Sequence, residues 1–154
     1  MYLWIKLLHV AAVIIFLGNI ATGLFWKAHA DRSRDPRIIA HTIDGIIRSD
    51  RLFTIPGVVL IIVFGVAAAM MAGLPLLRVP WIAYSLLMFA ISGMAFVLRV
   101  APLQRKLLAL AQRGIEGQMP WDEYSSVSRA WLFWGDVALV TPLIALVLMV
   151  LKPT

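Results

Sequence analysis

The sequence contains no cysteine and few charged residues, and both shortages exclude whole classes of protein. Without cysteine the chain cannot form disulfides, thiolate metal sites or cysteine nucleophiles. Charged residues make up 14% of the 154 residues, whereas soluble domains average about 25%. Hydrophobic residues reach 62%, which is too many to hide inside so small a soluble body. The composition therefore excludes a water-soluble globule, and the same apolar richness excludes a disordered chain.

Acidic residues are almost missing from four long apolar runs. The runs cover residues 2–26, 52–73, 81–101 and 131–151. Asp136 is the only acidic residue in any of them. Each run is long enough to cross a bilayer as a helix, which needs about 20 apolar residues. Helices also satisfy every backbone polar group in lipid. We therefore predict an all-α fold: an integral membrane four-helix bundle that forms a single transmembrane domain over residues 1–154.

Lys and Arg number 14 against 8 Asp and Glu, which gives a net charge of +6, and most of these basic residues flank the apolar runs. Those of the first connection are Lys27, Arg32, Arg34, Arg37, Arg48 and Arg51. Those of the third are Arg105, Lys106, Arg113 and Arg129, whereas the second connection has only Arg78. Because positive loops stay in the cytoplasm, we predict a bacterial inner (cytoplasmic) membrane protein with both termini outside the cytoplasm. This placement indicates contact with the lipid bilayer and argues against a nucleic-acid partner.

The two basic connections also carry helical patterns. Asp35 and Pro36 are a typical helix start, with Asp as the cap and Pro in the first turn. The following helix either lies on the membrane or runs straight into the second apolar run, with a kink near Pro56. After the third run an amphipathic helix continues to Gly114, and Pro120 starts another helix that feeds the fourth run. We therefore predict cytoplasmic helical extensions on the bundle.

Ionisable side chains within the apolar runs are costly in a membrane, so each is a candidate functional residue. Lys6 and His9 lie three residues apart on one helical face. An imidazole in this position is able to ligate haem iron or another transition metal. The alternative is an interhelical hydrogen bond from His9, with Lys6 reaching back to the outer interface.

A second pair of ionisable residues lies in the third and fourth runs. Arg99 ends a run that descends to the cytoplasm, and Asp136 follows the start of a run that begins there, so both should lie at similar depth. We expect an ion pair between them, which either fixes helix packing or serves as a proton relay or ligand anchor. Arg99 is equally suited to bind a lipid phosphate or a propionate.

Several stretches of the chain resemble known membrane families. The opening YLWIKLLHVAAVI resembles the first span of the oxygen-independent, four-span protoporphyrinogen oxidases of the HemJ type, and RLFTIPGVVLIIVFGV resembles their second span. The resemblance implies haem b bound by His9. Ser85 stands where that family has a functionally essential lysine, so the resemblance does not extend to the oxidase activity. The stretches TIPGVVL and APLQRKL more closely resemble a bacterial family of predicted integral membrane proteins of unknown function, which is related to the CopD copper-resistance membrane domain.

Three functions remain open from the sequence. The first is a redox protein that binds haem b or porphyrin, with His9 on the metal and Lys6 or Arg99 holding carboxylates. The second is a non-catalytic accessory protein that oligomerises, for example as a homodimer. The third is a copper or small-solute transporter. Copper would need several Met or His ligands on one inward face, and the chain offers only Met88 and Met94 beside His9.

Overall fold

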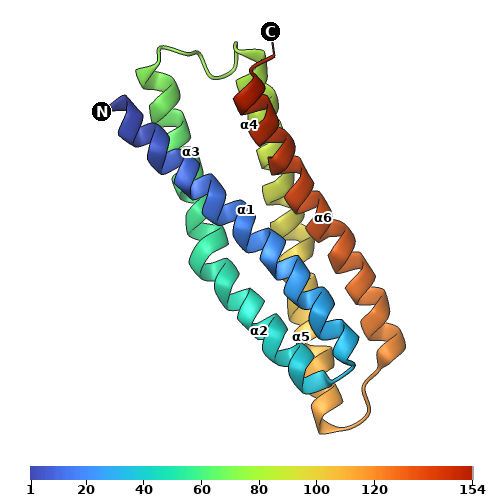
Figure 1. Ribbon diagram of the computed structural model, residues 1–154. Coiled ribbons are helices and arrows are strands. Elements are labelled where there is room, and N and C mark those ends of the chain that lie inside the picture. The colour runs from blue at the N-terminus through green and yellow to red at the C-terminus, as the bar shows by residue number, and fades with distance from the viewer. Residues whose placement is uncertain (154) are drawn as a thin grey trace.

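The computed structural model describes residues 1–153, which form long helices joined by short turns. Four continuous helices are long and apolar enough to cross a membrane. These are Tyr2–Ser33, Pro36–Met71, Pro80–Glu116 and Trp121–Leu151. They run alternately up and down and pack as one bundle (Figure 1). The structure thus confirms the predicted all-α four-helix membrane bundle.

The first and fourth of these helices are uninterrupted, whereas the second and third each contain a π-helical turn. In chain order the elements are α1 (Tyr2–Ser33), α2 (Pro36–Ser49), η1 (Asp50–Thr54), α3 (Ile55–Met71), α4 (Pro80–Ala95), η2 (Phe96–Val100), α5 (Ala101–Glu116) and α6 (Trp121–Leu151). Pro56 and Pro102 are each the second residue after a π turn. A proline lacks the backbone N–H and crowds the carbonyl four residues earlier, so the wider turn before it relieves that clash.

The predicted helical extensions are not separate elements. Asp35 does cap the expected helix, because its carboxylate accepts a hydrogen bond of 2.8 Å from the backbone N–H of Arg37. That helix then runs through η1 into α3 as one rod, which is one of the two expected arrangements. α5 likewise continues the rod of α4 and ends at Glu116, slightly beyond the predicted end at Gly114. A helix that continues without a break needs no additional capping.

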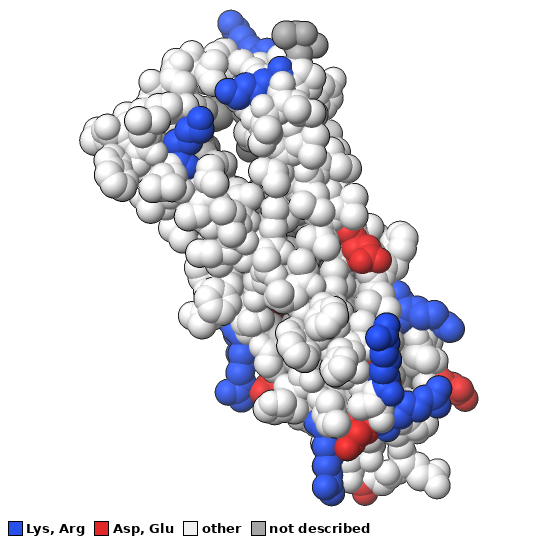
Figure 2. Space-filling view, viewed as in Figure 1, with Lys and Arg blue, Asp and Glu red and all other residues white. Residues whose placement is uncertain are grey.

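The bundle has two distinct ends. Both chain termini and the turn over residues 72–79 lie at one end, which we call the terminal end (Figure 1). The turn after α1 and the loop over residues 117–120 lie at the other, which we call the charged end. Figure 2 shows that Lys, Arg, Asp and Glu gather there, whereas the middle of the visible face is almost entirely uncharged. This distribution is the one expected of a bundle whose middle lies in lipid.

Packing also differs between the two halves. Toward the terminal end α1 packs on α3 and α4 packs on α6, and within residues 1–153 the backbones of α3 and α4 do not come close together. Toward the charged end α2, α5, α1 and α6 all meet around a larger apolar core that includes Leu107 and Trp131. A smaller cluster of Ala12, Phe16 and Ile61 joins α1 to α3, and Phe89 of α4 packs against it. The chain therefore forms a closed four-helix bundle at one end and, toward the other, two helix pairs that touch through Phe16 and Phe89.

Candidate functional site

His9 lies half-buried between α1 and α3. Its Nδ1 is 3.0 Å from the backbone carbonyl oxygen of Ile61. Because a carbonyl can only accept, Nδ1 carries the proton and donates, and Nε2 of the neutral ring keeps its lone pair. Gly65 makes room for the ring, since a Cβ atom at this position would lie 2.9 Å from Cε1 of His9. The interhelical hydrogen bond that the sequence allowed is thus present.

Lys6 lies within one helical turn of His9, whereas Arg99 lies far from it. Lys6 is exposed one turn nearer the terminal end of α1. The rings of Phe16 and Phe89 meet with centroids 5.6 Å apart, so they set the relative height of α1 and α4. Counting a rise of about 1.5 Å per residue from this contact places Arg99 roughly 25 Å from His9 along the bundle. Arg99 and His9 therefore do not belong to one site.

The expected ion pair between Arg99 and Asp136 is wrong. No such pair forms within residues 1–153, and both side chains are exposed. The guanidinium of Arg99 instead lies 5.3 Å from the centroid of the Trp134 ring, which confirms that the two helices bring these residues to similar height. Gly135 and Ala138 occupy the buried face of α6, so Asp136 between them points away from the helix contact.

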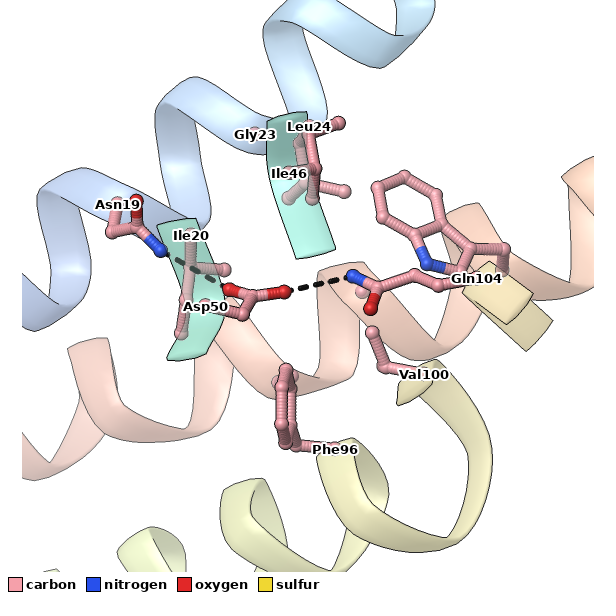
Figure 3. A pocket seen from close by; sticks show the side chains of 12 residues that line it. Asn19, Ile20, Gly23, Leu24, Ile46, Asp50, Phe96, Val100 and Gln104 are labelled. Carbon is pink, nitrogen blue, oxygen red and sulfur yellow. Dashed lines mark hydrogen bonds between the residues drawn. The ribbon is translucent and has the colours of Figure 1, made fainter. Parts of the chain in front are cut away.

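The strongest polar site in the bundle surrounds Asp50, which the sequence analysis did not single out. Asp50 is the first residue of η1 and is 6% exposed. Its carboxylate accepts hydrogen bonds from Asn19 Nδ2 at 3.1 Å, Thr54 Oγ1 at 2.7 Å and Gln104 Nε2 at 2.9 Å. Figure 3 shows Asp50 between Asn19 and Gln104, which come from α1 and α5. Within residues 1–153 no Lys or Arg pairs with Asp50, so neutral donors alone hold this buried carboxylate.

A small cavity adjoins this cluster between the two π turns. Asn19, Asp50 and Gln104 line it together with the apolar side chain of Phe96 from η2. It has room for roughly one water molecule. Trp131 of α6 also lines the cavity; this residue is 3% exposed and its indole Nε1 has no hydrogen-bond partner. π-Helical turns frequently mark functional positions, and here two of them border one cavity.

A second polar cluster lies nearer the charged end and joins α1 to α6. Lys27 is 1% exposed, and its Nζ donates to Asp31 Oδ2 at 2.5 Å and to the hydroxyl of Ser128. The hydroxyl of Tyr124 donates to the other oxygen of Asp31 at 2.5 Å. The same ammonium lies 5.5 Å from the ring centroids of Tyr124 and Trp131. Lys27 is thus a buried, fully partnered cation and not a free loop charge.

The chemistry available at these places differs. His9 offers one imidazole nitrogen to a metal, whereas within residues 1–153 no group of three His, Cys, Asp or Glu side chains gathers to hold a metal ion without outside ligands. The Asp50 cluster offers a carboxylate and two amide oxygens to a hydrogen-bonding ligand. In the Lys27 cluster the buried ammonium, the Asp31 carboxylate and the hydroxyls of Ser128 and Tyr124 bond to one another, so the cluster functions as a helix clamp.

Taken with the four long apolar helices, this architecture defines a multi-pass integral membrane protein. The family model described as "Predicted integral membrane protein (DUF2269)" matches residues 3–153, and the chain therefore belongs to that family. No curated protein and no solved structure matches the chain significantly. The resemblance to the HemJ-type oxidases and to the CopD domain remains a prediction.

Proposed function

We propose that this protein binds haem b through His9 and acts as a redox protein of the bacterial inner membrane, with the charged end in the cytoplasm. One observation carries the proposal: Nδ1–H of His9 donates to the carbonyl of Ile61. Histidines that ligate metals almost always donate their other ring N–H in this way, which fixes the tautomer and leaves Nε2 for the metal. Bound haem would supply one-electron redox chemistry.

The surroundings of His9 are compatible with a flat ligand. The backbones of α3 and α4 do not come close together, and the two helix pairs of the terminal half touch through Phe16 and Phe89, seven residues along α1 from His9. Lys6 shares a helical face with His9 and would offer a cation to a propionate. Arg99 is too distant for that role, so the proposed site comprises His9 and Lys6 alone among the predicted residues.

The proposal is tested by the absorption spectrum of protein purified in detergent from haem-replete cells. We expect a Soret band that H9A abolishes. H29A is the matched control because His29 lies exposed on the same helix, and it should keep the band. G65A forces the His9 ring to move and should shift or weaken the band while the bundle stays folded. A colourless wild-type protein, or a band that survives H9A, would overturn haem binding at this residue.

A second candidate function, an oligomerising membrane protein, is favoured by Asp136. This carboxylate is exposed within an apolar run, and exposed Arg99 stands at similar height without pairing to it. An unpaired charge facing lipid is costly. A twofold axis between two copies would place Asp136 of each against Arg99 of the other. Two such pairs would remove the charges from lipid in both copies at once.

The homodimer is tested by counting subunits per complex in lipid vesicles at increasing dilution. D136L should raise the monomer fraction, whereas F133L, an exposed apolar change on the same helix, should not. The double exchange D136R with R99D should restore the dimer because it reverses both charges. If D136L dimerises as well as the wild type does, Asp136 is not the contact.

A further inference from the structure

The indole of Trp131 has an unexplained feature. It extends from α6 into the core of the charged half and is buried there, yet its N–H donates to no atom within residues 1–153. Buried polar groups in native proteins nearly always have a partner, either protein or ordered water. Because Trp131 lines a cavity, its unpartnered indole N–H indicates that this cavity holds an acceptor.

The wall of the same cavity offers acceptors to such a ligand. Asn19 and Gln104 use their amide nitrogens to hold Asp50, so both amide oxygens remain as acceptors. The Asp50 carboxylate accepts three hydrogen bonds, which leaves capacity for a further one because its two oxygens offer about four lone-pair sites. The cavity thus presents one donor from α6 and several acceptors from α1, η1 and α5.

These groups define the chemical class of the ligand. It must accept from the Trp131 N–H and donate to at least one oxygen, and it must fit a space for roughly one water molecule. A metal cation fails the first condition because it cannot accept a hydrogen bond. An anion fails the second because it would face the Asp50 carboxylate. We infer that one water molecule occupies this cavity and bridges Trp131 to the Asp50–Gln104 pair.

The location of the site also indicates how the water exchanges. Asp50 and Gln104 line a second cavity as well, whose rim includes the exposed residues Arg51 and Arg105. The same two side chains thus line both cavities. We expect the water to exchange with solvent on this side of the bundle, whether or not His9 binds a cofactor.

The test uses protein labelled with ¹⁵N at tryptophan and reconstituted in lipid nanodiscs. The Trp131 indole signal is assigned by its loss in W131F. We expect a magnetisation-transfer cross-peak between this indole proton and water, and no change in its position when NaCl is replaced by choline chloride. Absence of the cross-peak in the wild type would overturn the proposal. A position that depends on sodium would also overturn it, because the occupant would then be a cation.

Two glycines of α1 provide a matched comparison. Gly23 lines the cavity, and an added Cβ would meet only Ile46 at an ordinary contact distance of 3.7 Å. G23A should therefore fold, fill the site and remove the water cross-peak. Gly18 faces open space on the same helix, so G18A should leave the cross-peak unchanged. A cross-peak that survives G23A would show that water reaches the indole elsewhere and would overturn this site.

Discussion

The charged half and the terminal half of the bundle are held together by different interactions. In the charged half, side chains with ionisable groups bridge segments far apart in the sequence, as Lys27 does to Ser128 and Asp50 does to Gln104. In the terminal half, single polar groups reach backbone carbonyls: Ser85 Oγ donates to the carbonyl of Ala145 at 3.2 Å, and His9 Nδ1 donates to that of Ile61. The Asp50 network joins three of the four long helices and the Lys27 cluster ties α1 to the fourth, whereas each single bond joins only two helices.

The solvent around each half accounts for the difference. Lipid tails are as apolar as the helix surfaces, so close packing at small residues must replace hydrophobic burial. Gly57 accordingly lies where an added Cβ would be 3.4 Å from Cβ of Phe16. Near the charged end, charged surface residues favour contact with water. There the burial of apolar side chains drives the helices together, as it does in soluble proteins. The same chain thus uses two modes of helix packing along its length.

The largest expected effect on this comparison comes from Lys27. K27M removes a buried cation and leaves the Asp31 carboxylate with only hydroxyl partners, which should cost about 3–5 kcal/mol of unfolding free energy. Unfolding by SDS in mixed micelles measures it. R48M is the control, because it breaks an exposed pair with Asp44 that contributes only about 0.3–0.5 kcal/mol. Equal losses in the two variants would contradict the view that the Lys27 cluster clamps α1 to α6.

The second effect is expected at Asp50. D50A leaves the donors of Asn19, Thr54 and Gln104 without their acceptor and should cost about 2 kcal/mol, because hydrogen bonds to charged groups contribute about 1.5–3 kcal/mol and the freed amides can bond again. D50N keeps one acceptor oxygen and should cost less. Thermal unfolding in detergent gives both values. A D50A protein as stable as the wild type would show that Asp50 does not hold the helices of the charged half together.

The smallest effect is expected in the terminal half. S85A removes one interhelical hydrogen bond to the Ala145 carbonyl and should cost about 0.6 kcal/mol, the average found for such bonds between membrane helices. The SDS titration again measures it, with S125A as the control because Ser125 is exposed and bonds only within its own helix. A loss as large as that of K27M would erase the distinction between the two halves.

The four rods could be predicted from the sequence because lipid leaves few alternatives to apolar helices. The capping of α2 by Asp35 could also be predicted, since its signal is local. The pairing of Arg99 with Asp136 could not, because counting residues fixes the height of a side chain but not its direction around the helix axis. Trp134 takes the position beside Arg99 that the prediction gave to Asp136.

The two buried clusters lay beyond sequence reasoning for a related reason. Gln104 is 54 positions from Asp50, and Ser128 is 101 positions from Lys27, so no local pattern connects them. Only one link had a local signal: Asp31 follows Lys27 by four residues, the spacing of neighbours on a helix. The lack of a hydrogen-bond partner for the Trp131 indole likewise could not be predicted, because it depends on how α6 packs against the other helices.

The π turn η1 changes which face α3 presents to its neighbours, relative to α2 in the same continuous helix. A residue added to a helix turns everything beyond it by about 100°, because 3.6 residues make one turn. Gly57, Ile61 and Gly65 follow η1 at intervals of four, and all three meet α1 through Phe16 or His9. Deleting a single residue between positions 50 and 54 would rotate these three residues together away from α1. The one additional residue in η1 therefore sets which face of α3 packs against α1 throughout the terminal half.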